Sequence, residues 1–88
     1  MIIVSQDKKA IYNFDNVISL QIEPTLKEYT IEVYDAINDG SSLGIYSSEE
    51  RAKEVLQEII SKYKTTLYNS KTNETIVNVP KVYEMPTK

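Results

Sequence analysis

Carboxylate, hydroxyl and amine groups are the side chains of this sequence that could do chemistry. The 88 residues include thirteen Asp and Glu, ten Lys and Arg and seven Tyr, but no Cys and no His. The chain therefore lacks a thiolate nucleophile, sulfur and imidazole ligands for transition metals, and the usual general base near neutral pH. Acid and base chemistry by paired carboxylates remains, but no spacing in the sequence places two carboxylates together in a cleft. The sequence predicts a protein that is not an enzyme.

Residues 35–40, Asp-Ala-Ile-Asn-Asp-Gly, have the start of a calcium-binding loop. Such a loop needs oxygen ligands at positions one, three and five and a glutamate at position twelve. Here Ile37 stands at position three and Tyr46 at position twelve, so the match fails. We interpret the segment as a hairpin turn in which Gly40 supplies a positive φ. No metal and no cofactor is expected.

Tyrosine is the unusual aromatic residue, with seven copies against one Phe and no Trp. Tyrosine is enriched at protein interfaces because it offers a large contact area with a polar tip. The functional interpretation is a partner-binding surface that contains Tyr34, Tyr46 and Tyr83. The alternative is that tyrosine is simply a good strand residue, and that the C-terminal segment covers these rings. The apolar residues of that segment are Val77, Val79, Val82 and Tyr83.

An amphipathic helix over residues 47–64 is the element around which the strands must be arranged. Its apolar side chains recur at helical spacing and form one stripe of roughly 140°: Ala52, Val55, Leu56, Ile59, Ile60 and Tyr63. Ser47 and Glu50 have the spacing of a capping box, which predicts that the helix begins at this serine. Glu49 and Lys53 form a well-oriented pair on the polar face.

Five short strands are predicted before the helix, at residues 2–5, 10–13, 17–23, 29–37 and 43–46. Alternation puts Ile18, Leu20 and Ile22 on one face of the third strand, and Tyr29, Ile31 and Val33 on one face of the fourth. The register then predicts that Leu43 and Ile45 join these residues under the helix. The same register sends Tyr34 and Tyr46 together to the opposite face.

The predicted fold is a single α+β domain over residues 1–88. It consists of an antiparallel meander of about five strands, with the helix packed across one face and one or two C-terminal strands after it. Residues 67–69 and 75–79 are the candidates for those last strands, and Pro80 would stop the second of them. Residues 81–88 are either an ordered edge segment or a loose tail.

The charge of the chain argues against nucleic acid as a partner. The formal net charge is -3, so the general attraction to phosphate is missing, and a local basic site would have to rest on Lys8, Lys9 and the C-terminal lysines. The N-terminal apolar run of four residues is too short for a signal peptide or a membrane span. We expect a cytoplasmic protein with no membrane partner.

Three segments of the sequence resemble a group of small uncharacterised proteins from Firmicutes and their phages or mobile elements. These are Met-Ile-Ile-Val-Ser-Gln-Asp at residues 1–7, Tyr-Ser-Ser-Glu-Glu-Arg-Ala-Lys at 46–53 and Tyr-Glu-Met-Pro at 83–86. The resemblance covers about a third of the chain and implies no activity, cofactor or catalytic residue. It implies a prophage or mobile-element accessory protein.

The function predicted from the sequence is a non-enzymatic protein-protein interaction module. Its partner would be another protein, or a second copy of the chain in a homodimer that forms through a sheet edge or through the face with Tyr34 and Tyr46. The alternative is a small ligand-binding protein or an enzyme that uses carboxylates and tyrosines, which would require a buried, polar-lined cavity. Nucleic-acid binding is the third hypothesis.

Overall fold

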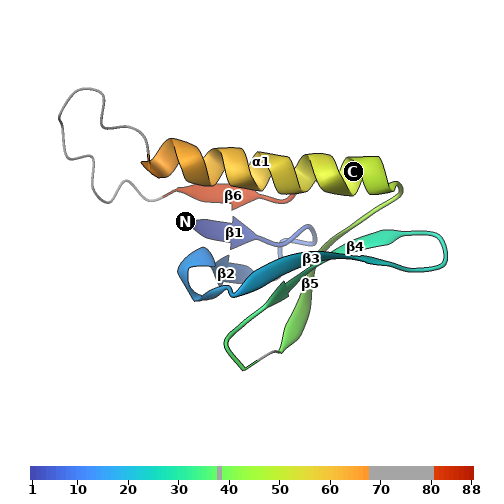
Figure 1. Ribbon diagram of the computed structural model, residues 1–88, viewed down its shortest axis with the longest axis horizontal. Coiled ribbons are helices and arrows are strands. Elements are labelled where there is room, and N and C mark those ends of the chain that lie inside the picture. The colour runs from blue at the N-terminus through green and yellow to red at the C-terminus, as the bar shows by residue number, and fades with distance from the viewer. Residues whose placement is uncertain (38, 68–80) are drawn as a thin grey trace.

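The computed structural model describes residues 1–37, 39–67 and 81–88 of the chain, which form six strands, one long helix and one short 3-10 helix (Figure 1). The elements are β1 (Ile2–Val4), β2 (Ile11–Asn13), η1 (Phe14–Asn16), β3 (Ser19–Pro24), β4 (Tyr29–Tyr34), β5 (Gly40–Tyr46), α1 (Glu49–Leu67) and β6 (Val82–Glu84). The predicted α+β class is confirmed, with five strands before the helix and a strand after it.

The strands are divided between two three-stranded sheets. The first sheet has the order β2-β1-β6, in which β1 is antiparallel to β2 and parallel to β6. The second sheet, β3-β4-β5, is an antiparallel meander. The break falls at η1, where the side chain of Asn13 caps the 3-10 turn by accepting from the Asp15 amide. This turn leads the chain out of the β1-β2 hairpin before β3 begins.

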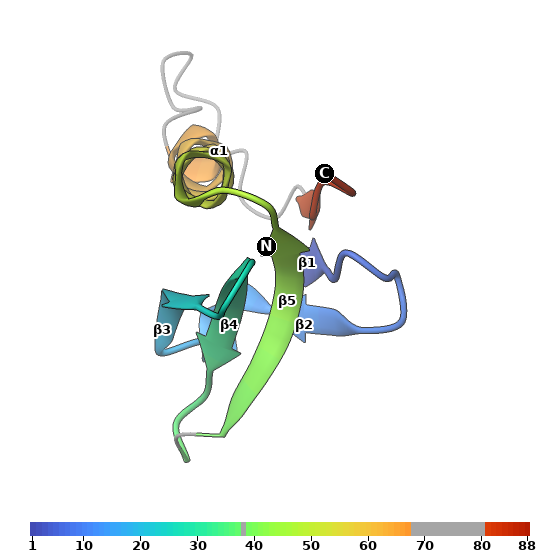
Figure 2. The same ribbon diagram turned by 90° about the vertical axis from the view of Figure 1, so that its right-hand side faces the viewer.

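Helix α1 lies above the β3 and β4 side of the second sheet, as the end-on view in Figure 2 shows. Its predicted apolar stripe supplies part of the core, because Ala52, Val55 and Ile59 are buried. The rest of the core comes from both sheets and from the C-terminal segment: Ile3, Ile31, Val33, Leu43, Tyr46 and Met85. One core therefore joins the helix to both sheets.

The N-cap of α1 is Ser48, and the predicted capping box at Ser47 is wrong by one residue. The Arg51 amide donates to Ser48 Oγ at 3.1 Å, and the Ala52 amide donates to the Ser48 carbonyl at 3.1 Å. An arginine three residues after the cap has no oxygen to return to the cap amide, so a capping box cannot form. The predicted pair of Glu49 and Lys53 is confirmed, with 3.0 Å between Oε1 and Nζ.

Replacing the cap serine should destabilise the protein more than replacing its neighbour. We expect Ser48→Ala to lower the free energy of unfolding by about 1 kcal/mol, because one amide of the first helical turn loses its acceptor. Ser47→Ala, the matched control, should change it by less than about 0.5 kcal/mol. Urea unfolding followed by circular dichroism measures both, and a larger loss for Ser47→Ala would contradict the assigned cap.

A β-bulge in β5 overturns the predicted register of this strand. Ile31 pairs with Gly44, but the next residue of β4, Glu32, pairs with Ser42, so Leu43 is the extra residue. A bulge reverses which side chains face each way along the strand. Leu43 is still buried, as predicted, but Ile45 is exposed and Tyr46 lies in the core with 2% of its surface accessible.

Two glycines accommodate tyrosine rings in the second sheet. A Cβ at Gly44 would lie 2.9 Å from the Tyr46 hydroxyl oxygen, so the absence of a side chain lets this ring fold back over β5. A Cβ at Gly40 would lie 2.7 Å from Tyr34 Cε1 on the strand opposite. The predicted positive φ at Gly40 is wrong, since neither glycine has one. Close approach of an aromatic ring explains these glycines, not turn geometry.

Residues 81–88 contribute to the first sheet and to the core. The Ile2 amide donates to the Lys81 carbonyl at 2.8 Å, the Met85 amide donates to the Val4 carbonyl at 3.0 Å, and the Met85 side chain is 1% exposed. The Gln6 side-chain amide donates to the carbonyls of Pro86 and Thr87 and also pairs with Ile45 of β5.

The strand predicted at residues 75–79 and most of that predicted at 67–69 lie outside the described residues, and residue 67 ends α1.

Candidate interaction surface

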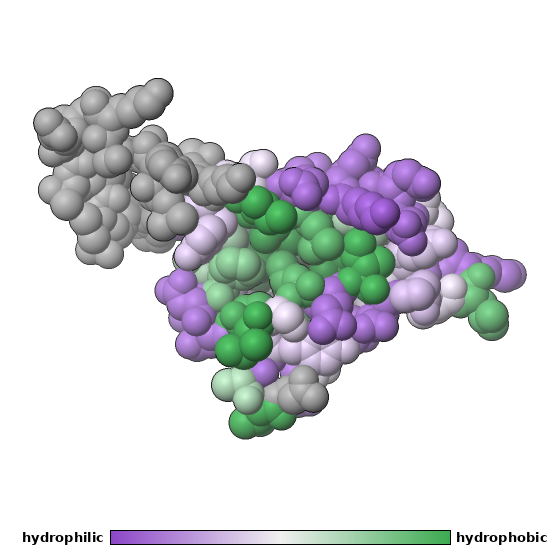
Figure 3. Space-filling model, viewed as in Figure 1, coloured by the Kyte–Doolittle hydropathy of each residue, from purple (hydrophilic) through white to green (hydrophobic). Residues whose placement is uncertain are grey.

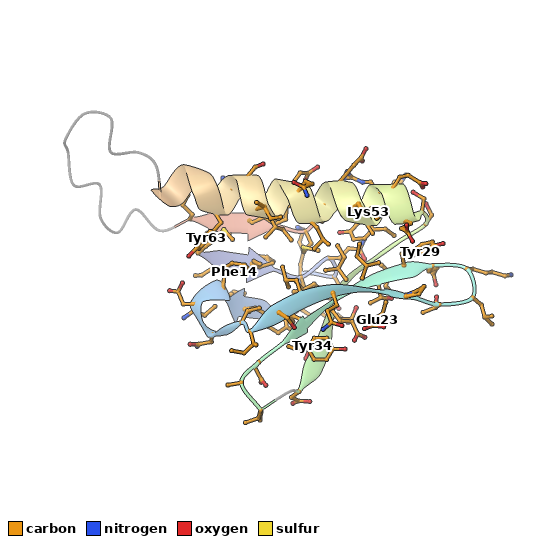
Figure 4. All side chains as sticks on the ribbon, viewed as in Figure 1. Phe14, Glu23, Tyr29, Tyr34, Lys53 and Tyr63 are labelled. Atoms are coloured by element: carbon orange, nitrogen blue, oxygen red, sulfur yellow. The ribbon has the colours of Figure 1, made fainter. Side chains whose placement is uncertain are left out.

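The three tyrosines predicted to form a partner surface do not share a face. Tyr34 lies on the outer side of the second sheet, which is turned away from α1, and its hydroxyl donates to Glu32 Oε2 at 2.8 Å (Figure 4). This hydrogen bond, with some loss of solvation, raises the pKa of Tyr34. Tyr46 lies in the core on the other side of the same sheet, since β5 is bulged. The prediction that Tyr34 and Tyr46 face the same way is wrong.

The hydroxyls of Tyr46 and Tyr83 make hydrogen bonds that hold the C-terminal segment against the rest of the molecule. The Tyr46 hydroxyl donates to the Pro86 carbonyl at 2.8 Å, and the half-buried Tyr83 donates to Glu58 Oε1 of α1 at 2.7 Å. Burial raises the pKa of Tyr46 to about 12. Burial and the hydrogen bond to Glu58 raise the pKa of Tyr83 as well. The alternative interpretation, in which the C-terminal segment covers a tyrosine, therefore holds for Tyr46.

These pKa values predict loss of stability at alkaline pH. Tyrosine in the unfolded chain ionises near pH 10, whereas folded Tyr46 keeps its proton until about pH 12. The unfolded state therefore binds fewer protons above pH 10, and the free energy of unfolding must fall as pH rises through this range. Urea unfolding at several pH values between 8 and 12 measures the slope. Tyr46→Phe should make that slope shallower, and an unchanged slope would contradict the assigned role of the hydroxyl.

The carboxylates of the Asp35 loop make local hydrogen bonds. Asp35 Oδ1 accepts from the amides of Ile37 and Asp39 at 3.0 and 3.1 Å, an arrangement typical of a hairpin turn. Asp35 and Asp39 also line a depression of about 230 Å³ between β2 and the β4-β5 hairpin. Within residues 1–37, 39–67 and 81–88, no three Asp, Glu, Cys or His side chains are placed to hold a metal ion.

An apolar groove lies between α1 and β3. It has a volume of about 240 Å³ and is open on the face shown in Figure 3, where apolar side chains gather beneath the helix. The groove is lined by Phe14, Val17, Ile18, Ser19, Leu20, Leu56, Ile59 and Ile60. Beside it the rings of Phe14 and Tyr63 contact each other, with centroids 5.4 Å apart (Figure 4). Seven of its eight lining residues are apolar.

The groove is open because two predicted core residues are not covered. Ile18 is 70% exposed, since β3 begins at Ser19 and the residue before it lies outside the strand alternation. Ile60 is exposed on the β3 side of the helix stripe. A three-stranded sheet is narrower than the predicted five-stranded one, so it cannot cover an apolar stripe of roughly 140°. The prediction that the helix buries Ile18 and Ile45 is wrong, because Ile18 lies before the start of β3 and the bulge in β5 turns Ile45 to the outer side of the sheet.

The edge of β3 runs along the groove. Among the described residues, β3 pairs only with β4, so one side of this strand has no partner. A natural edge strand is usually protected by lysine, proline or a bulge. Here the described pairing of β3 contains no bulge, the strand contains no lysine, and Pro24 stands at its last position.

The charged side chains that the second sheet presents beside this edge are acidic. Glu23 and Glu32 lie on the outer side of the second sheet, and the sequences of β3, β4 and β5 contain no Lys or Arg. Asp15 and Asp35 line a shallow depression that continues from the groove past Ile18 to Ile37. The four ion pairs found among the described residues involve none of these carboxylates.

The groove could have been foreseen in part from the width of the helix stripe. The stripe contains six apolar residues, more than one side of a small sheet needs, and Ile60 lies at its margin. No sequence pattern predicts that Phe14 and Val17 line the groove, because both residues lie in a segment with turn-forming neighbours. Their position depends on η1, which connects β2 of the first sheet to β3 of the second.

Comparisons with known proteins found no family for this chain. A scan against protein-family models found no match, and searches of curated proteins and of solved structures found no match either. Within the described residues, no helix is long and apolar enough to cross a membrane. The groove between α1 and β3, beside a strand edge that has no partner among the described residues, is the candidate functional site.

Proposed function

We propose that this protein is a non-enzymatic interaction module that binds an apolar segment of a partner protein in the groove between α1 and β3. The observation that supports the proposal is the open apolar groove beside the edge of β3, which pairs with no second strand in the described part of the chain. Ile18, Ile60 and Tyr63 expose apolar surface on one face, and neighbouring apolar side chains of this kind mark sites of association.

The size of the groove supports a protein segment over a small molecule. Its volume of about 240 Å³ is below the range of typical small-molecule sites, which begins at roughly 300 Å³. It would take one or two apolar side chains. A partner segment can insert these side chains and extend along β3 or the helix on either side.

The charge around the groove supports a basic partner over a second copy of the chain. In a symmetric dimer through this face, Asp15 and Glu23 of each copy would approach the same acidic region of the other. Like charges brought together across an interface are unfavourable, and each copy carries a net charge of -3. A segment with apolar residues flanked by Lys or Arg complements the groove and its acidic surroundings.

Selection from a displayed library of random dodecapeptides tests the proposal without knowledge of the natural partner. We expect enriched peptides that bind the wild-type protein and lose affinity for Ile18→Gln. Removing an isoleucine that a peptide would bury removes about 1.5–3 kcal/mol, which corresponds to roughly a 10- to 100-fold loss of affinity. Fluorescence anisotropy of labelled peptides measures it.

Ile11→Gln is the matched control for this experiment. Ile11 is 69% exposed, close to the 70% of Ile18, but it lies on β2 and does not line the groove. Enriched peptides should bind this variant as they bind the wild type. A selection that returns no peptide, or peptides indifferent to Ile18→Gln, would contradict the proposal. A dimer in sedimentation that only Ile18→Gln dissociates would assign the groove to a second copy.

A further inference from the structure

We infer that the partner segment binds as an extended strand added to the edge of β3, with apolar side chains that alternate with Lys or Arg. The inference rests on the proposed function and specifies the conformation and sequence pattern of the segment. Strand addition supplies main-chain hydrogen bonds for affinity, and the alternating side chains provide specificity.

The hairpin between β3 and β4 determines which backbone groups of β3 point outward. The Thr25 amide donates to the Glu28 carbonyl at 2.8 Å and the Glu28 amide donates to Thr25 Oγ1 at 3.2 Å, so the backbone amides of these opposed residues point toward each other, as in a hydrogen-bonded pair. Such pairs recur at every second residue of an antiparallel ladder. Glu23 and Gln21 therefore direct their backbone groups toward β4, and Leu20 and Ile22 direct theirs toward the open edge.

The outward groups of Leu20 and Ile22 have no partner among the described residues. Each residue presents one N–H donor and one C=O acceptor, which gives an added strand four groups to pair with. Pro24 is the next residue in the same phase, and it lacks an N–H. A proline in an edge strand belongs where its missing N–H would have faced solvent, as it does here. The hydrogen-bond pattern of the ladder and the position of the proline therefore indicate the same outward direction for these backbone groups.

Side-chain direction connects this edge to the groove. Leu20 pairs with Val33 and Ile22 pairs with Ile31, so both point to the helix side of the sheet. In an antiparallel addition, the residues hydrogen-bonded to Leu20 and Ile22 would direct their own side chains to that side as well. Leu56 and Ile60 of α1 lie on the other wall of the groove and would pack against them.

The intervening residues of the added strand would face the outer side of the sheet. That side carries Glu23 and Glu32 and no basic residue from the three strands. Lys or Arg at these positions would lie next to the edge residues Gln21 and Glu23. The absence of an edge lysine on β3, which would repel such a segment, supports the same charge pattern.

Two blocked heptapeptides of identical composition test the pattern. Lys-Val-Lys-Val-Lys-Val-Lys alternates as a strand, and Lys-Val-Lys-Lys-Val-Val-Lys has its valines at helical spacing. We expect the alternating peptide to bind at least tenfold more tightly by calorimetry, and to slow amide exchange at Leu20 and Ile22. Equal binding, or binding by neither peptide, would overturn the inference.

N-methylation distinguishes strand addition from simple packing in the groove. Methylating the valine amides of the alternating peptide should reduce affinity at least tenfold, because these amides face β3 in an antiparallel addition. Methylating the lysine amides should leave affinity within about threefold. The reverse result would show parallel addition to the same edge, and binding by both methylated peptides would overturn strand addition.

Charge removal provides a second matched comparison. Glu23→Gln should weaken binding of the alternating peptide and reduce its dependence on salt, whereas Glu50→Gln, on the exposed first turn of α1, should not. Failure of the inference can be told from failure of the proposed function. Displayed peptides that require Ile18 but lack alternation would overturn the inferred strand addition and leave the proposed function standing. A library that yields no peptide would contradict both the inference and the proposed function.

Discussion

Tyr46→Ala should lower the free energy of unfolding by about 3–5 kcal/mol and lower the melting temperature accordingly. The Tyr46 ring is among the largest fully buried side chains, and it contacts a core that joins α1, both sheets and the C-terminal segment. Truncating a buried aromatic residue to alanine costs about 3–5 kcal/mol. A domain of this size has a total stability of about 4–13 kcal/mol, so the loss removes much of it. Thermal unfolding by circular dichroism measures the effect.

Two other tyrosine variants serve as controls for this expectation. Tyr34→Ala removes a half-buried ring from the outer side of the sheet and should cost about 1 kcal/mol or less. Tyr46→Phe keeps the ring and loses only the hydroxyl, at about 1 kcal/mol, because the Pro86 carbonyl still accepts from Gln6. If Tyr46→Ala remained folded while Tyr34→Ala unfolded, the bulged register of β5 would be wrong.

The parts of the fold that were predicted correctly depend on local periodicity. Ala52, Val55 and Ile59 recur at helical spacing, and the buried face of α1 follows directly from them. Alternation in β3 and β4 likewise puts Leu20 opposite Val33 and Ile22 opposite Ile31. A sequence contains such information because each residue's direction depends on its near neighbours alone.

The bulge at Leu43 could not be predicted from periodicity. Leu43 and Ile45 alternate as a regular strand would, yet Tyr46 takes the buried position that alternation assigns to Ile45. The bulge provides space for a large ring over Gly44 and lets the ring reach the C-terminal segment. The hydrogen bond between Tyr46 and Pro86 joins residues forty positions apart, so a local pattern does not contain it.

The open apolar surface lies elsewhere than the surface predicted from the sequence. An interaction surface was expected around tyrosines, whereas the open apolar surface lies at Ile18 and Ile60. The predicted and the observed surfaces differ in position because the strands are divided between two sheets. This division leaves one margin of the apolar stripe of the helix without a strand beneath it. Propensities of single residues do not determine how many strands lie under a helix.

Met85→Asp should destabilise the protein more than any surface substitution in the C-terminal segment. The Met85 side chain is 1% exposed and belongs to the core, so an aspartate there would bury a charge with no partner or force the segment off the sheet. We expect a loss of about 3 kcal/mol or more, typical of a buried unpaired charge. Urea unfolding and binding of a hydrophobic dye measure this loss and any exposure of the core.

Val82→Asp is the matched control for the Met85 variant. Val82 lies three residues earlier in the same segment and is 49% exposed, so the same new charge can remain in water. It should change the free energy of unfolding by about 0.5 kcal/mol or less. Similar effects of the two substitutions would contradict a docked C-terminal segment. A loss confined to Met85→Asp would instead mean that the last eight residues close the core over Tyr46.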